Sequence, residues 1–224
     1  ACSSSTSRRV VQLLLDYGAC VNARADYQTP RSRSLPLLQS PTPLHLLCMR
    51  RIRRSNGRRD DNDADDELLR RRAATHSAIL RLLLEHGADV ALRDRVALHD
   101  DDVPRLRHHG RTALMLAAAQ NHVHLLDIFG DADVTAVDAA DGSNALLLAV
   151  ATTAVEAVSW LLQHNADVHH QRCSDKHTAF SRAVRGGQSQ GTVDIATLLI
   201  QHDASVVEHR FDEMNMFSYA LQRR

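Results

Sequence analysis

The chain has 224 residues, a length that allows one large domain or two small ones. Hydrophobic residues make up 44% of it and aromatic residues only 4%, so we expect a sizeable core of Ala and Leu rather than of aromatic side chains. The 27 basic and 27 acidic residues cancel, and a net charge of zero provides no global field that would attract nucleic acid or an anionic membrane.

Cysteine spacing and hydropathy argue against a disulfide-stabilised scaffold and against a membrane-inserted protein. The cysteines lie far apart and form no CxxC pair, at Cys2, Cys20, Cys48 and Cys173. This spacing favours free thiols in a reducing, intracellular compartment over a disulfide scaffold. No apolar run approaches the roughly 20 residues that cross a bilayer, so we expect no membrane insertion.

Two short phrases recur along the chain. An apolar helical run that ends in Ala-x-Val reads VVQLLLDYGACV at 10–21, ILRLLLEHGADV at 79–90, LLDIFGDADV at 125–134, VSWLLQHNADV at 158–168 and IATLLIQHDASV at 195–206. A second phrase precedes most of these, and reads TPLHLL at 42–47, TALMLA at 112–117, NALLLA at 144–149, TAFSRA at 178–183 and NMFSYA at 215–220. From Asn144 to Ala166 the two phrases have the spacing of a helix, a tight turn and a second helix.

The residues at the ends of these phrases predict where the helices begin and end. A Thr or Asn heads each first phrase, where its side chain can accept a hydrogen bond from a free backbone N–H group of a helix start. Each second helix ends at a residue type that tolerates a left-handed backbone, namely Gly18, Gly87, Asp131, Asn165 and Asp203. In the third repeat we expect the second helix to end early, at Gly130.

Helix pairs with these signatures resemble the ankyrin repeat, a unit of about 33 residues with two antiparallel helices, a β-turn and a T-P-L-H-x-A signature. TPLHLL at 42–47 keeps most of that signature, and LLLEHGADV at 82–90 keeps the second half of the repeat almost whole. The resemblance implies an all-α solenoid in which β-turns or hairpins connect stacked helix-turn-helix repeats. Since each helix pair buries its apolar stripe against its neighbours, we expect Trp160 in the core and Cys48 and Cys20 as packing or turn residues.

In chain order, the phrases predict a single domain over residues 1–224. It comprises a partial repeat at 8–24, repeats at about 40–94, 110–137, 142–171 and 176–209, and a half repeat, a lone first helix, at 210–224. Loop insertions interrupt the array at 27–41, 49–72 and 96–109. The insertion at 49–72 is rich in Arg and Asp and cannot bury enough apolar area to offset its ordering entropy, so we expect it to be mobile or disordered. We expect the chain to be monomeric, and to be either a stretch of a longer array or an array with unconventional end caps.

The resemblance implies a protein-binding function. Ankyrin arrays bind other proteins through a concave surface formed by their β-turn tips and first helices, and a rigid platform keeps the ordering cost of binding small. We therefore expect a non-enzymatic module without a cofactor, the recruiting part of a larger intracellular adaptor or scaffold, whose partner is a protein. The candidate contact residues lie at the tips and on the helix faces just after them: Arg93, Arg105, Arg107, His109, Arg111, Met115, Asp141, Ser143, His170, Lys176, Arg182 and Phe211. Arg105 and Arg107, beside an acidic run at 100–102, would set charge specificity.

An alternative function rests on the arginine block RRIRRSNGRR at 50–59, which is typical of a nuclear-import or polyanion-binding patch. The acidic run DDNDADDE that follows it neutralises the block in cis, and no aromatic residues interleave to stack bases, so a solvated loop is the competing interpretation. The alternative to a protein-binding module is therefore a nuclear or nucleic-acid-associated regulatory factor.

A metal site and catalysis are the remaining alternatives. Imidazole and thiolate groups that could bind zinc lie across one predicted hairpin, at His164, His169, His170, Cys173 and His177. Their spacing matches no zinc-finger pattern, so we predict no metal. No GxSxG elbow is present, and GGQSQG at 186–191 lacks the Lys-Ser/Thr end of a phosphate loop, so we interpret it as a lengthened turn between helices.

Overall fold

The computed structural model describes residues 2–23, 41–49, 63–94, 110–130, 132–139, 141–186, 189–207, 210–211 and 214–215. Its elements are, in chain order, α1 (Cys2–Asp16), α2 (Pro43–Met49), α3 (Asp63–Glu85), α4 (Ala113–Ala119), α5 (Val123–Phe129), α6 (Ala145–Ala151), α7 (Val155–Gln163), α8 (Ala179–Arg185), α9 (Gln190–His202), the 3-10 helix η1 (Ala204–Val207), and the strands β1 (Arg210–Phe211) and β2 (Met214–Asn215).

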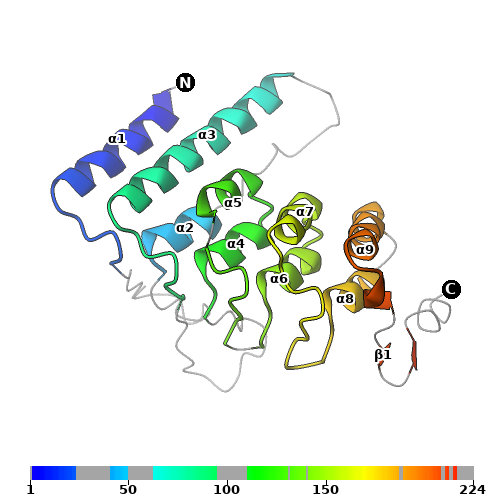
Figure 1. The fold of residues 1–224 in the computed structure, drawn as a ribbon. Helices are drawn as coiled ribbons and strands as arrows, with labels where there is room; N and C mark the ends of the chain where they lie inside the picture. The colour runs from blue at the N-terminus through cyan, green and yellow to red at the C-terminus, as the bar shows by residue number, and fades with distance from the viewer. Residues whose placement is uncertain are drawn as a thin grey trace, which may run out of the picture.

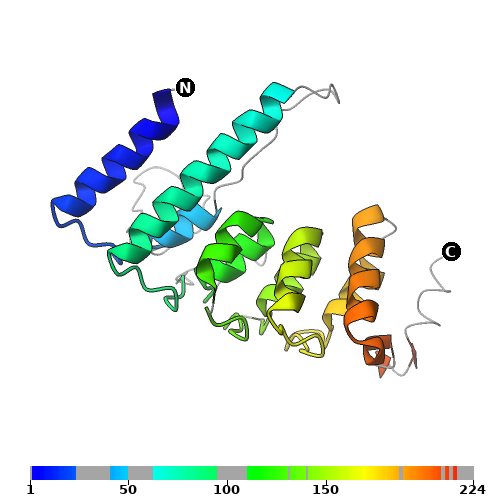
Figure 2. The ribbon, with the colours of Figure 1, turned by 45° about the horizontal axis from the view of Figure 1, so that its top comes forward.

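The helices form two layers along one axis, which Figures 1 and 2 show as a row of stacked pairs. Helices α2, α4, α6 and α8 contact one another in succession and form the first layer, whereas α1, α3, α5, α7 and α9 do the same in the second layer. Pairs such as α6 and α7 join the two layers. The segments that connect successive repeats gather at one edge of the row, at the bottom of Figure 1. The predicted all-α solenoid is confirmed.

Polar side chains begin three of the first-layer helices, as the sequence predicts. The side chains of Thr112, Asn144 and Thr178 each accept a hydrogen bond from the backbone N–H group three residues later, at 3.4, 2.9 and 3.2 Å. These bonds satisfy donors that a helix start would otherwise leave without a partner. At the start of α2, the Thr42 hydroxyl instead bonds to the ring of His45, at 2.7 Å.

The left-handed helix ends are confirmed at three positions and wrong at a fourth. Gly18, Gly87 and Asn165 have φ angles of 81°, 82° and 57°. Asp203 has a φ of −149°, because its side chain accepts the N–H of Ser205 at 2.9 Å and so begins η1 rather than closing α9 with a left-handed turn.

Helix α5 ends early, as predicted for the third repeat. It stops at Phe129, and Gly130 takes the left-handed backbone with a φ of 50°. Asp131, where the sequence places this turn, lies outside the described residues. Two more left-handed residues, Asn121 and Thr153, lie in the tight turns between the two helices of their repeats, with φ angles of 58° and 56°.

The predicted loop at 49–72 is wrong over residues 63–72, which form the first turns of α3. The charges of this segment are sorted along the helix, with acidic residues first and arginines after them. Acidic groups stabilise the positive end of the helix dipole, and Glu67 pairs with Arg71 one turn later at 2.7 Å. Helix α1 likewise begins before the predicted residue 8, at Cys2. Met49 of this insertion ends α2, whereas residues 50–62 lie outside the described residues, as do 27–40 and 96–109 of the other two insertions.

The predicted first helix at 215–220 does not begin at Asn215. This residue lies in β2, where it pairs with Arg210 of β1, and Met214 pairs with Phe211. In the antiparallel pair, backbone N–H and C=O groups find partners on the opposite strand. At a helix start, the free N–H groups would instead depend on the Asn215 side chain as a cap. Residues 216–224 lie outside the described residues.

Alanine, leucine and valine side chains form the core, as the composition predicts. Helices α4 and α6 each bury six of their seven residues, and small alanines among them let neighbouring helices approach closely. Trp160 is only 6% exposed, and its indole N–H donates to Asp127 at 2.8 Å. Cys48 is fully buried, and burial raises the pKa of its thiol to about 12, so it is a packing residue. Cys20 lies exposed in a turn.

Among the helices that the structure describes, none combines the length and the apolar character that a bilayer-crossing segment requires.

Candidate protein-binding surface

In the part of the chain that the structure describes, three hairpins of the same design connect successive repeats, and we call them tips. They span residues 94–111, 138–143 and 172–177, although 95–109 and residue 140 lie outside the described residues. A backbone hydrogen bond from the first residue to the carbonyl of the last closes each tip, at 2.9, 2.7 and 3.0 Å. The next-to-last residue donates its N–H back to the carbonyl of the first, at 2.9 Å in all three tips.

The next-to-last residue of every tip has a left-handed backbone. It is Gly110, Gly142 or Lys176, with φ angles of 82°, 72° and 57°. A glycine adopts this conformation without strain, whereas a lysine does not. Lys176 is also exposed, so the third tip holds a cationic side chain on a strained backbone at the outer edge of the row.

Neighbouring tips pack directly against one another. A Cβ atom on Gly142 would lie 2.4 Å from the Sγ of Cys173 in the next tip, and one on Gly110 would lie 2.9 Å from the Cβ of Ala139. The backbone N–H of Cys173 also donates to the carbonyl of Asp141 at 2.9 Å. The tips therefore form a continuous stacked row rather than separate loops.

Several side chains predicted to contact a partner instead hold the tips together. The Arg93 guanidinium donates to the carbonyl of Gly110 at 3.1 Å and to that of Val137. Arg111 bonds to the fully buried carboxylate of Asp138 at 2.9 Å. His170 bonds to the carbonyl of Gly142 in the preceding tip, at 2.6 Å. A side chain with this role keeps the surface rigid, and only its exposed part can meet a partner.

Two of the candidate residues are buried, and two others keep part or all of their side chains accessible. Met115 is fully buried and Ser143 is 3% exposed, so neither lies on the surface. Met115 occupies the position of the His in the T-P-L-H signature, and at the equivalent position in α2 His45 is also fully buried. Lys176 is exposed and Arg182 is half-buried on α8. Phe211 is in β1, whereas Arg105, Arg107 and His109 lie outside the described residues.

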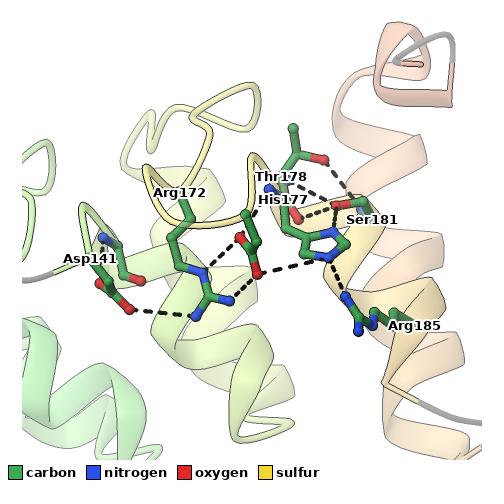
Figure 3. A network of polar contacts seen from close by, with 8 residues as sticks. Asp141, Arg172, His177, Thr178, Ser181 and Arg185 are labelled. Atoms are coloured by element: carbon green, nitrogen blue, oxygen red, sulfur yellow. Dashed lines mark hydrogen bonds and ion pairs between the residues drawn. The ribbon is translucent and has the colours of Figure 1, made fainter. Parts of the chain in front are cut away.

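A polar network links the second and third tips to α8 (Figure 3). Arg172 donates from Nε to Asp175 at 2.9 Å, makes a second bond to the same carboxylate, and reaches Asp141 in the preceding tip at 3.5 Å. The hydrogen bond from Arg172 holds the pKa of Asp175 down at about 2. Burial raises the pKa of Asp141, but hydrogen bonds from Ser143 and the charge of Arg172 outweigh it, so the net shift is downward.

His177 is the buried centre of the other half of this network (Figure 3). Arg185 lies 2.6 Å from the Nε2 atom of His177, and since a guanidinium can only donate, Nε2 is the acceptor. Nδ1 therefore carries the proton and donates to the hydroxyl of Ser181 at 3.0 Å. Burial lowers the pKa of His177, which agrees with a neutral ring.

Asp175, His177 and Ser181 have the residue types of a hydrolytic triad but not its geometry. A nucleophilic serine needs a histidine nitrogen that can take its proton, whereas here Nδ1 donates to the Ser181 oxygen. That hydroxyl also accepts the N–H of Thr178 at 2.9 Å and donates to the Thr178 carbonyl at 3.0 Å. Ser181 is 1% exposed, so its hydroxyl serves the capping box of α8.

The side chains considered as zinc ligands do not share a common site. The Nδ1 of His164 bonds to the carbonyl of Trp160 at 2.8 Å, and His169 pairs with Asp203 at 2.8 Å. His170 and His177 make the bonds described above, and Cys173 lies exposed in its tip. Within the described residues, no group of three or more His, Cys, Asp or Glu side chains is placed to hold a metal ion.

The sequence analysis did not single out Arg172, Asp175 or Arg185. The available signal was the Arg-x-x-Asp spacing of 172–175 inside one short tip, which allows a bidentate pair. The contact of Arg172 with Asp141 had no such signal, because the two residues lie in different repeats.

Comparison with known families identifies these repeats. A family model described as ankyrin repeats (3 copies) matches residues 76–172 and again residues 114–210. The two matches together cover 76–210, more than half of the chain, and include all three tips from residue 94 onwards. No curated protein matches the sequence. With helix pairs in two layers, capped first helices and a row of tip hairpins, the chain belongs to the ankyrin repeat family.

Proposed function

We propose that the chain is a non-enzymatic module that binds a partner protein through the concave surface formed by its tips and its first-layer helices. Ankyrin repeats are in general protein–protein interaction modules, and the family is typically non-enzymatic. The proposal specifies, for this chain, the surface that the partner contacts.

The observation that carries the proposal is the stacked row of tips. Bonds such as those from Arg93 and His170 to carbonyls of neighbouring tips fix the edge of the row before any partner arrives. A surface that is already ordered loses little conformational entropy on binding. The exposed Lys176 on a strained backbone supports the same interpretation, because strain of this kind concentrates at functional positions.

A larger adaptor is the setting that fits this role. We infer that the chain recruits a protein for a larger intracellular adaptor or scaffold. The free thiols of Cys20, Cys48 and Cys173 support a reducing compartment. The loop at 96–109 begins and ends within the first tip, so it would widen or cover the same surface.

Affinity capture from a cell extract tests this proposal. The intact chain would be compared with Lys176→Glu, with a variant that lacks 96–109, and with Arg81→Glu as a matched charge reversal on the exposed face of α3. We expect Lys176→Glu to reduce the recovery of the captured protein several-fold and Arg81→Glu to leave it unchanged. Equal loss in both variants would remove the tips from the binding surface.

The alternative function is a nuclear or nucleic-acid-associated factor that uses the arginine block at 50–59, which lies outside the described residues. The observation that favours it is the separation of charge, since part of the neutralising acidic run is fixed in the first turns of α3. The test is the salt dependence of binding to a duplex DNA probe and to a single-stranded RNA probe, with and without 50–59. Binding that falls steeply with salt and requires 50–59 would support this function, and salt-insensitive capture of a protein would exclude it.

A further inference from the structure

The amino-terminal end of the row carries an apolar stripe that the described residues leave uncovered. Val10, Leu13 and Leu14 of α1 are 49–55% exposed, and Tyr17, directly after the helix, is 88% exposed. Their spacing of three, four and seven residues places them on one face of the helix. Of the seven large hydrophobic side chains exposed in the described part of the chain, four belong to this stripe. Apolar side chains that gather on one surface, unlike scattered single ones, indicate an interaction site.

The next second-layer helix shows what covers such a stripe within the row. Segment 79–90 of α3 repeats the sequence pattern of α1. Its Leu83, which corresponds to Leu14, is only 3% exposed, and its Leu82, which corresponds to Leu13, is 8% exposed. Among the described elements, α3 packs against α1, α2 and α5, whereas the main contact of α1 is with α3. The stripe therefore continues the helix-packing interface that stacks the row.

Opposite charges flank the stripe near its two ends. Arg9 and Asp16 are seven residues, or two helical turns, apart and so lie on the same flank of α1. Gln12 between them donates to Asp16 at 2.8 Å, and it lines with Arg9 the groove that separates α1 from α3. Arg9 and Asp16 are both exposed, and neither forms an ion pair with another described residue.

We propose that the stripe binds a second copy of this chain, with the two α1 helices packed antiparallel about a twofold axis. A twofold contact requires a surface that complements itself. When the axis passes between Leu13 and Leu14, Arg9 of each copy lies within about 3 Å, along the helix, of Asp16 of the other copy. Antiparallel packing therefore forms two pairs of opposite charge, whereas parallel packing would place like charges side by side.

The dimer adds a property that a single copy does not have. The second-layer helices run toward the edge at which the tips gather (Figure 1), so antiparallel packing places the tips of the two copies at opposite edges. The dimer therefore presents two protein-binding surfaces that do not obstruct each other. One helix from each copy covers less than the roughly 1,600 Å² of a standard interface, so we expect a reversible dimer with a Kd on the order of 10 µM.

Sedimentation velocity under reducing conditions tests the inference, since these conditions keep exposed thiols such as Cys20 from cross-linking two copies. The intact chain would be measured between about 1 and 300 µM, a range that brackets the expected Kd. We expect the mass to rise with concentration from 24.9 kDa toward twice that value. A mass that stays at 24.9 kDa throughout, as the sequence-based expectation of a monomer requires, would overturn the inference.

Two substitutions of an apolar residue by glutamate locate the contact. Leu13→Glu places a carboxylate at the centre of the stripe and is expected to weaken the dimer by about tenfold or more. Val193→Glu is the matched control, because Val193 is 52% exposed on α9, at the other end of the row (Figure 2). We expect this variant to keep the Kd of the intact chain. Equal weakening in both variants, or a dimer that persists in Leu13→Glu, would overturn the inference.

Exchange of the two flanking charges tests the antiparallel arrangement. Arg9→Asp and Asp16→Arg each turn two attractive contacts into repulsive ones, so each should weaken the dimer by about three- to tenfold. The double variant, Arg9→Asp with Asp16→Arg, restores opposite charges across the axis and should return the Kd to within about threefold of the original. Circular dichroism melts would verify that each variant is folded. Single reversals without effect, or a double variant that does not recover, would contradict the antiparallel packing and with it the inference.

Discussion

The central repeats and the amino-terminal end of the row bury their apolar residues to very different degrees. Helix α6 has neighbours on both sides of its layer and buries six of its seven residues. Helix α1 contacts α3 on one side, and its residues Val10, Leu13 and Leu14 remain 49–55% exposed, with Tyr17 at 88%. The two helices carry similar apolar residues, so the contribution of a leucine depends on how many neighbouring repeats cover it, as expected for a stacked array.

Truncation of a leucine should give the largest contrast between the two regions. Leu146→Ala in α6, where the side chain is 1% exposed, is expected to lower the free energy of unfolding by about 2–5 kcal/mol. Leu14→Ala in α1, where the side chain is 55% exposed, should lower it by less than about 1 kcal/mol. Urea unfolding followed by circular dichroism measures both values, and similar losses would contradict the comparison.

Substitution of a glycine should give the second-largest difference in stability between the two regions. Gly142→Ala combines a left-handed backbone with a Cβ that would lie 2.4 Å from the Sγ of Cys173, and should cost about 2–4 kcal/mol of stability. Gly18→Ala has a similar φ of 81° but no atom within 4 Å of the added Cβ, so only the backbone term of about 1–2 kcal/mol remains. A larger loss for Gly18→Ala would show that contact between the tips matters less than backbone strain.

The histidines at the boundary between the two regions should make the stability of the protein depend on pH. The rings of His76 on α3, of His122 just before α5 and of His124 on α5 lie 5.5–6.4 Å apart. Burial, and then the charge of His122, lower the pKa of His124 to about 4, although Asp127 acts in the opposite direction.

The sign of this pH effect follows from the lowered pKa. Between pH of about 6.5 and 4 the unfolded chain binds the His124 proton and the folded chain does not, so stability is complete above 6.5 and falls as the pH drops through this window. We expect a loss on the order of 1–2 kcal/mol between pH 7 and pH 5. His124→Gln should flatten this dependence, and the exposed His202→Gln on α9 should not. Urea midpoints at the two pH values measure the change.

Removal of a helix cap should have the smallest effect. Thr178→Ala deletes the capping box of α8 and is expected to cost about 1 kcal/mol, within the usual range of 0.5–2 kcal/mol. Thr197→Ala is the matched control, because its exposed hydroxyl bonds only within α9. Thermal melts of both variants measure the difference. A cap effect at Thr178 as large as the Leu146→Ala effect would mean that the network beneath the third tip collapses with it.

Local signals explain most of what the sequence predicts correctly. The caps at Thr112, Asn144 and Thr178 depend on bonds to residues three positions later, and the left-handed ends at Gly18 and Asn165 depend on the residue type alone. The ankyrin repeats were recognisable for the same reason, because the same local signals recur in each repeat.

The candidate surface was predicted less completely, because exposure is a property of the stack. Met115 and Ser143 were expected at the surface and are buried, since the spacing within a repeat does not reveal what the next repeat covers. The start of α3 was missed for another reason. A segment rich in Arg and Asp indicates a loop by composition, but its order of charges, with the Glu67–Arg71 pair, supports a helix.

By itself, the sequence of this protein determined the paired helices of the central repeats and the caps at Thr112, Asn144 and Thr178, because these features depend on contacts between residues a few positions apart. Only the tertiary structure decided which tip side chains serve the fold and which remain available. Arg111 and Arg182 are both arginines beside a tip, yet Arg111 bonds to Asp138 of the next tip, while Arg182 is half-buried and forms an ion pair with no carboxylate of the described residues. The difference arises because ion pairing and burial at the tips join neighbouring repeats, and those distances are set only when the repeats stack.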